Sequence, residues 1–399
     1  MPELALPEEG NAQQSLVSDK PKPDSGWYFG LPWESLSSMI QGRSAIDLTA
    51  MPISNREEAE SFVLNYGFDL TLAEDRLEVE GYFNEAIRFI EHRFLSDEVD
   101  WIEQGEAPPP ADRIPLEVIK RRDIVDLLMM ASQANDPHRP WACALLKVIH
   151  TLVYIRNSPL YRYHSYASEV ILKRFRSILI PQADGTVLLQ GKEGHDLRLH
   201  SFEAKHYKPR ESILIKLLCK KENVAENVWD LVGVRLVTFH VAEAVLAVEL
   251  LREQKIILFP NVVPSRSRNT LIDIKHFREL YESKLEQVQS GKLDLSALES
   301  LFQSDEFLLP EETHASQNPS SAQHYRSLHI TCRQLLKIPA AAGVDPLDSR
   351  FAFPYEVQIL DLENYVLNKT GDGAHGNYKL RQLCTARKRV LGSLLKKQD

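Results

Sequence analysis

The chain lacks long apolar runs, and its few cysteines are not paired along the sequence. No apolar stretch approaches the roughly 18 residues that a membrane-spanning helix needs, so we expect no membrane insertion. The 4 cysteines form no Cys-x-x-Cys pair, which argues against a zinc ribbon or a redox motif. Their neighbours are apolar, which is typical of buried thiols in a reducing compartment.

Three further absences narrow the class of protein. Residues 1–26 lack the basic start and apolar centre of a signal peptide, and their polar, proline-rich pattern predicts a disordered tail. The formal net charge of −9 argues against wholesale, non-specific binding of nucleic acid. No segment repeats at a fixed period. Together these features predict a cytoplasmic globular protein.

Helical periodicity dominates the first part of the chain, and alternating patterns begin after residue 180. The predicted helices of the first part span 55–67, 75–96, 116–133, 139–157 and 165–180. After a hairpin-like stretch, the second part is predicted to contain helices 209–221, 241–254 and 273–290, strands 231–239, 255–259, 326–333 and 353–360, and a surface loop 303–323. We therefore predict an α+β protein, with an all-helical region over 27–180 and a mixed-sheet domain flanked by helices over 181–399.

Acidic residues occupy unusual places in the predicted strands. Asp230 opens the strand 231–239, while Glu356 and Gln358 lie two apart in the strand 353–360 and so share one face of it. Carboxylates on apolar strands are costly to bury unless they meet a metal or a cation. This placement predicts a magnesium and phosphate site on a sheet.

Two short motifs place basic residues beside this strand. In Lys208-x3-Ser212-x3-Lys216, two lysines flank a helix start, which suits a polyphosphate, although a solvated helix with a capping serine has the same pattern. In Asp230-x2-Gly233-x-Arg235, a carboxylate suits Mg²⁺, although Asp230 pairing with Arg235 would also explain it. The glycine would let a ligand or another backbone approach closely.

Two more motifs lie near the end of the chain. Tyr325-x3-His329 offers an aromatic face on which a purine can stack, although ordinary strand packing gives the same spacing. Glu356-x-Gln358 is followed by His375-x2-Tyr378-Lys379 on a helix-like stretch. Each motif alone is weak, and their shared order is the stronger signal.

In this order, the motifs resemble the synthetase domain of RelA/SpoT-type alarmone enzymes, over about residues 200–399. The resemblance implies a nucleotidyltransferase-like fold, ATP as donor, a guanine nucleotide as acceptor, and Mg²⁺ held by Asp230 and Glu356. It implies that Glu356, Gln358 and Asp230 are catalytic. The residues that it implies bind nucleotide are Lys208, Ser212, Lys216, Arg235, Tyr325, His329, His375 and Lys379.

The chain also departs from the family pattern. His206 stands where the family usually has arginine, and Leu360 stands where its last strand has another. Gln323 and His324 replace the Asn-Gly that usually precedes the stacking tyrosine, and an insertion covers about 262–322. These changes concern the acceptor side more than the predicted metal site.

The resemblance leads to one favoured function and two alternatives. The favoured function is pyrophosphate transfer from ATP to the 3′-hydroxyl of a guanine nucleotide, as in (p)ppGpp synthesis. The first alternative is transfer to the 3′ end of tRNA, suggested by basic clusters at Arg266, Arg268 and 387–389. The second is a non-catalytic nucleotide-binding or interaction module. No His-Asp dipeptide occurs in the helical region, so we predict no alarmone hydrolase there.

Overall fold

The computed structural model describes residues 33–96, 113–205, 209–220, 230–310, 326–338, 350–370 and 375–395. The chain divides into two compact units, Met1–Arg43 and Ser44–Asp399. In the first unit the described element is α2 (Trp33–Ile40), and the predicted tail 1–26 lies outside the described residues. All that follows concerns the second unit.

Helices form the first part of this unit. They are η2 (Ala45–Asp47), α3 (Arg56–Tyr66), α4 (Ala73–Phe89), the π-helical η3 (Ile90–Phe94), α5 (Leu116–Arg121), α6 (Ile124–Ser132), α7 (Arg139–Asn157), α8 (Pro159–Arg162) and α9 (His164–Arg176). As the sequence predicts, Asn55 caps α3, its side chain accepting from the Glu58 amide at 2.9 Å. The single helix predicted over 116–133 is wrong: Arg122 adopts a left-handed φ of 47°, and Asp123 caps a new helix.

Two sheets follow. The smaller is antiparallel and contains β1 (Leu179–Pro181), β2 (Val187–Leu189) and β3 (Leu197–Leu199). The larger contains β4 (Ser201–Lys205), β5 (Val232–Thr238), β6 (Arg268–Asn269), β7 (Leu328–Lys337) and β8 (Arg350–Asp361), in the order β4-β5-β8-β7-β6. Only the central pair β5–β8 is parallel, so the larger sheet is mixed and the α+β class is confirmed.

The remaining elements join strands of the larger sheet or follow its last strand, β8. They are α10 (Arg210–Cys219), α11 (Glu243–Glu253), η5 (Phe259–Asn261), η6 (Pro264–Arg266), α12 (Ile274–Gln289), α13 (Ser296–Phe302), α14 (Leu362–Thr370), α15 (His375–Leu391) and η9 (Gly392–Leu394). The predicted strand 255–259 is wrong. Lys255 turns the chain with a φ of 60°. Ile256 follows this turn and is buried, and its carbonyl accepts from the Tyr355 hydroxyl at 2.6 Å.

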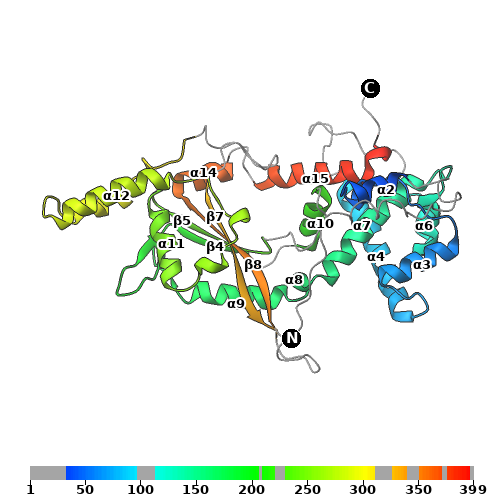
Figure 1. Ribbon diagram of the computed structural model, residues 1–399, viewed down its shortest axis with the longest axis horizontal. Helices are drawn as coiled ribbons and strands as arrows, with labels where there is room; N and C mark the ends of the chain where they lie inside the picture. The colour runs from blue at the N-terminus through cyan, green and yellow to red at the C-terminus, as the bar shows by residue number, and fades with distance from the viewer. Residues whose placement is uncertain are drawn as a thin grey trace, which may run out of the picture. The chain divides into compact units, whose positions relative to one another are not determined.

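The larger sheet has one apolar face and one polar face. Val234 and Val357 lie on the apolar face and are buried. Phe175 of α9 packs there, with its ring centroid 6.0 Å from that of Phe202 and 6.2 Å from that of Tyr355. Both α9 and α11 lie against the sheet (Figure 1). The polar face is therefore the side available for chemistry.

Helix α14 covers only one end of the polar face. Its Tyr365 packs with Val237 of β5 and Leu360 of β8 in a small separate apolar cluster. Leu360 is therefore a buried packing residue. The rest of the polar face carries the side chains described below.

Buried apolar side chains from both sides of residue 180 belong to one connected hydrophobic core. The predicted boundary at residue 180 stays a prediction.

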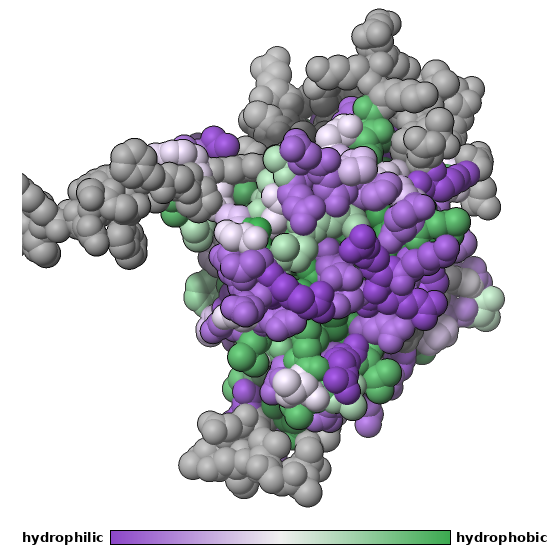
Figure 2. All heavy atoms as spheres, turned by 90° about the vertical axis from the view of Figure 1, so that its right-hand side faces the viewer, coloured by the Kyte–Doolittle hydropathy of each residue, from purple (hydrophilic) through white to green (hydrophobic). Residues whose placement is uncertain are grey.

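Hydrophilic residues dominate the side of the molecule on which α3 and α6 lie (Figure 2), and Arg56 there pairs with Asp123 and Asp126 at 2.9 and 2.8 Å. Across the described residues, no helix combines the length and the apolar character needed to cross a membrane.

Candidate active site

Two rows of side chains cross the polar face of the larger sheet, because register partners on neighbouring strands point to the same face. The first, called the Glu356 row, contains Lys205, Gly233, Glu356 and Thr331. The second, called the Gln358 row, contains Glu203, Arg235, Gln358, His329 and Arg268. The fold thus gathers charged and polar residues from five strands onto one surface.

Glu356 is the centre of a hydrogen-bond network between the two rows. Its Oε1 lies 2.9 Å from Nδ1 of His329 and accepts from Nε2 of Gln358 at 2.8 Å. Its side chain is only 18% exposed. Within the described part of the chain, no hydrogen bond is recorded on Oε2, which leaves that oxygen for a ligand.

The carboxyl group of Glu356 has a lowered pKa. Burial raises this pKa, but the hydrogen bond and charge of His329, helped by Gln358, more than offset the burial, while nearby Asp230 opposes them. Glu356 is therefore an anion at neutral pH and can only accept hydrogen bonds. Nδ1 of His329, 2.9 Å from Oε1 of this anion, therefore carries a proton and donates to it.

Arg235 braces the Gln358 row from both sides. Its Nε and Nη2 donate to Oε1 of Gln358 at 3.2 and 3.1 Å, and its Nη1 donates to Glu203 at 3.0 Å. Glu203 also accepts from the Tyr365 hydroxyl and from Lys369 of α14. Arg235 thus holds the side-chain amide of Gln358, and this amide in turn orients the Glu356 carboxylate.

Asp230 lies two residues before β5, where Nζ of Lys216 approaches its Oδ1 to 2.5 Å. Its charge raises the pKa of Glu356, so the two carboxylates are electrostatic neighbours. The described residues hold no group of three or more His, Cys, Asp and Glu side chains with metal-site geometry. Mg²⁺ needs only one or two carboxylates beside water and phosphate oxygens, so Asp230 and Glu356 fit it.

Further lysines surround these carboxylates, and sequence reasoning missed them. Burial, then the charge of Arg235, lowers the pKa of Lys205, with Asp230 and Glu356 opposing. Burial, then the charge of Lys216, lowers the pKa of Lys220 to about 8. Ammonium groups crowded together in this way suit a polyanion. The alternation Glu203, Lys205 against Phe202, Ala204 was the available signal for β4.

The structure brings together most of the predicted residues that it describes. Asp230, Lys216, Arg235, His329, Glu356 and Gln358 all lie on or beside the two rows. Lys379 of α15 is close enough to lower the pKa of Lys205. Ser212 lies one turn before Lys216 on α10. Lys208, Tyr325, His206, Gln323 and His324 lie outside the described residues, as does the side chain of His375.

One predicted basic cluster is not a surface patch. Arg387 is fully buried and its Nε donates to the Phe94 carbonyl at 2.9 Å. Arg389 pairs with Asp47 at 2.8 Å. Arg387 and Arg389 therefore point inward, because their partners come from distant parts of the chain. Arg266 and Arg268, by contrast, are exposed.

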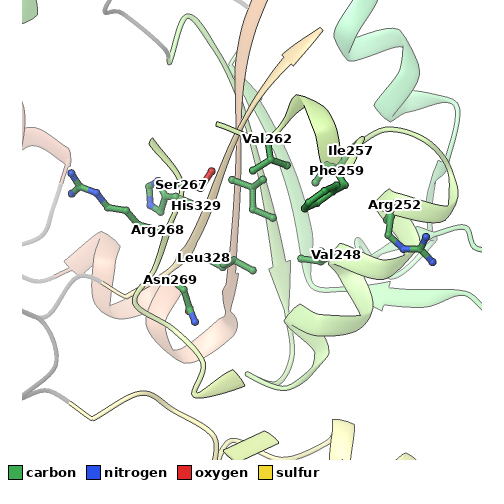
Figure 3. Close-up of a pocket in the computed structure, with 11 residues that line it drawn as sticks. Val248, Arg252, Ile257, Phe259, Val262, Ser267, Arg268, Asn269, Leu328 and His329 are labelled. Atoms are coloured by element: carbon green, nitrogen blue, oxygen red, sulfur yellow. The ribbon is translucent and has the colours of Figure 1, made fainter. Parts of the chain in front are cut away.

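Two further features lie near the site. His164 is 5% exposed, and its Nε2 lies 3.1 Å from the Leu231 carbonyl, so it holds the chain beside Asp230. A cavity of about 400 Å³ lies between α11 and the β6–β7 edge. Phe259, Val262 and Val248 lie on its apolar side (Figure 3). His329 and Arg268 also line it, so this cavity adjoins the Gln358 row.

Among known proteins, the chain is similar to solved structures of alarmone synthetases. No protein-family model matches the chain, and no curated protein matches its sequence. Among solved structures, small alarmone synthetase 1 from Bacillus subtilis bound to its product pppGpp is 16% identical, over 49% of this chain and 75% of that one, with a TM-score of 0.26. Small alarmone synthetase 2 from Bacillus subtilis is 16% identical over 61% and 89%, with a TM-score of 0.29. A GTP pyrophosphokinase family protein from Streptococcus pneumoniae is 16% identical over 48% and 70%, with a TM-score of 0.24. Likeness at these scores carries no argument about activity.

Proposed function

We propose that the polar face of the larger sheet transfers pyrophosphate from ATP to the 3′-hydroxyl of a guanine nucleotide. One observation supports this most: Gly233 leaves a gap between Lys205 and Glu356 in the Glu356 row. A Cβ built on Gly233 would meet no described atom within 4 Å. A space with a cation on one side and an anion on the other suits a metal–phosphate group.

The lysines bind the donor in this proposal. Lys216 and Lys220 lie at the end of α10, and Lys205 lies across the gap from Glu356. Their ammonium groups neutralise the triphosphate and hold it against the sheet, since phosphoryl transfer depends mainly on positioning and electrostatic stabilisation.

The reaction forms one P–O bond and breaks another. The 3′-hydroxyl oxygen of the acceptor attacks the β-phosphorus of ATP, the bond to the oxygen between the α- and β-phosphorus breaks, and AMP leaves. Glu356, ionised at neutral pH, accepts the hydroxyl proton. Gln358 keeps the carboxylate in place, and His329 stabilises its charge.

Asp230 and Glu356 are the residues that would hold Mg²⁺. A bound Mg²⁺ supplies positive charge that neutralises the phosphate oxygens during transfer. Oε2 of Glu356 and the carboxylate of Asp230 offer the hard oxygen ligands that this ion prefers.

A transfer assay tests this function. The pure protein is incubated with γ-labelled ATP, Mg²⁺ and GDP, GTP or GMP, and label is sought in a new guanine nucleotide. Transfer of label to one acceptor, with release of AMP, is the expected result. A folded protein that transfers label to none of the three contradicts the proposal.

Exposed arginines favour tRNA as the second candidate acceptor. Arg268 belongs to the Gln358 row, and Arg266 and Arg333 are also exposed beside β7. A basic strip that continues past the site suits a polyanion longer than a nucleotide. Label appearing in tRNA, and lost when the 3′ adenosine is removed, would identify this acceptor.

A further inference from the structure

The last turn of α10 is held by a side chain from another helix. The final four carbonyls of an α-helix have no partner within the helix. Here Nη1 of Arg389, on α15, donates to the Leu218 carbonyl at 2.8 Å and also to the Lys220 carbonyl. A guanidinium group at a helix C-terminus is also favoured by the helix dipole. The same turn presents Lys216 to Asp230.

Arg389 is fixed on its other side by η2. Its Nε and Nη2 lie 2.9 and 2.8 Å from Oδ1 of Asp47, and Nζ of Lys147 donates to its carbonyl at 3.1 Å. The side chain of Arg389 is only 15% exposed. One guanidinium group thus joins η2, α10 and α15, which lie far apart in the sequence. Only arginine has a planar fork that can serve a carboxylate and two carbonyls together.

We propose that Arg389, oriented by Asp47, is a positioning residue that fixes the last turn of α10 and so holds Lys216 against Asp230. The inference rests on the proposed function, since the position of Lys216 matters through the phosphates that it binds. In this proposal Arg389 acts through the backbone carbonyls that it holds. Through Asp47, the inference also gives the helical region a part in shaping the site.

The opposite end of α10 provides a matched control. Arg210, the first residue of α10, pairs with Glu85 of α4 at 3.0 Å, and this pair is also partly buried. Glu85→Gln removes an ion pair of similar geometry from the same helix. Because Arg210 lies six positions before Lys216, this change leaves the last turn intact. A general loosening of α10 and a specific loss at its end can therefore be told apart.

The test uses the full chain with Arg389→Lys, Asp47→Asn and the double variant. Hydrogen exchange of the backbone amides of 216–220 is measured, together with calorimetric binding of inorganic tripolyphosphate. Arg389→Lys keeps the charge but loses the fork, so exchange in this turn accelerates and binding weakens on the order of tenfold. Asp47→Asn gives a smaller change in the same direction. The double variant matches Arg389→Lys, because Asp47 acts through Arg389.

Several results would overturn the inference. Unchanged exchange in 216–220 in both single variants shows that Arg389 does not hold this turn, whatever the binding result. Faster exchange with unchanged binding, or equal loss of binding in Glu85→Gln, shows that the contact is only structural. If the wild-type protein binds no tripolyphosphate, the proposed function fails, and the exchange result still decides whether Arg389 fixes α10. Asp47→Asn provides this answer even if Arg389→Lys folds poorly.

Discussion

Gly233 and Glu356 are register partners on the parallel strands β5 and β8, and the glycine leaves the space beside the carboxylate open. Lys205 faces the same glycine from β4. A glycine inside a strand weakens the strand, since it packs no side chain and loses more backbone entropy on folding. Glycine at position 233 therefore lowers the stability of the folded protein, and the proposed ligand-binding role would account for a glycine there.

Adding a side chain at position 233 should separate stability from binding. Gly233→Ala meets no described atom within 4 Å and should raise the free energy of unfolding by about 0.4–1 kcal/mol. The same methyl group intrudes on the phosphate, so ATP affinity falls on the order of tenfold, and Gly233→Val lowers it further. Urea unfolding and calorimetry with ATP measure the two effects. Gly81→Ala, in an open position on α4, is the control that leaves ATP affinity unchanged. Unchanged affinity in Gly233→Val would mean that the gap holds no ligand.

Replacing Glu356 by glutamine should abolish transfer without unfolding the protein. The amide keeps an oxygen that can accept from Gln358 and His329, but it has no charge for the metal and cannot take a proton. Transfer should fall about 100-fold or more. Glu363→Gln, at an exposed position on α14, is the control that keeps activity. Full activity of Glu356→Gln would instead favour a role for the site that does not need this carboxylate.

The lowered pKa of Glu356 predicts how stability depends on acid. Because the folded-state pKa lies below the ordinary 4.5, this group stabilises the protein fully above that pH. The contribution is lost as the pH falls through the folded-state value. Urea unfolding at a series of acidic pH values should show that wild type loses stability more steeply than Glu356→Gln below about pH 4.5. Parallel curves would show that the pKa of Glu356 is not lowered in the folded protein.

Local sequence patterns predicted the strands that carry the central acids. The alternation in 353–360 placed Glu356 and Gln358 on one face, and the structure has both on the polar face of β8. The helix predicted over 55–67 likewise matches α3 closely, with Asn55 as its cap. In each case the signal lies within a few residues, as strand alternation and helix capping do.

Long-range pairing was beyond these local patterns. Lys205 neighbours Glu356 only because β4 pairs with β5, and β5 pairs with β8 more than 100 positions later. The basic run 387–389 suggested a basic cluster for tRNA, yet Arg387 is buried and Arg389 pairs with Asp47 near the start of the helical region. A charged side chain turns inward when distant segments supply its partners, and the neighbouring sequence does not record this.

Lys220 should make polyphosphate binding depend on pH near neutrality. Burial, the charge of Lys216 and that of Arg266 lower its pKa to about 8, with Asp230 opposing. An anion binds the protonated form better, so affinity for tripolyphosphate should fall between roughly pH 7 and roughly pH 9. Stability should change in the opposite direction. An unfolded lysine keeps an ordinary pKa of 10.5, so between about 8 and 10.5 the unfolded chain binds more protons and stability rises with pH.

Lys220→Arg is the decisive comparison, because arginine stays charged throughout this range. The ligand's own titration affects both proteins equally, so the difference between their affinities isolates Lys220. Calorimetry should show a steeper fall for wild type, and urea unfolding should show the rise in stability for wild type alone. Identical pH profiles for the two proteins would mean that Lys220 keeps an ordinary pKa and that α10 ends in a less crowded group of cations than its neighbours Lys216 and Arg266 imply.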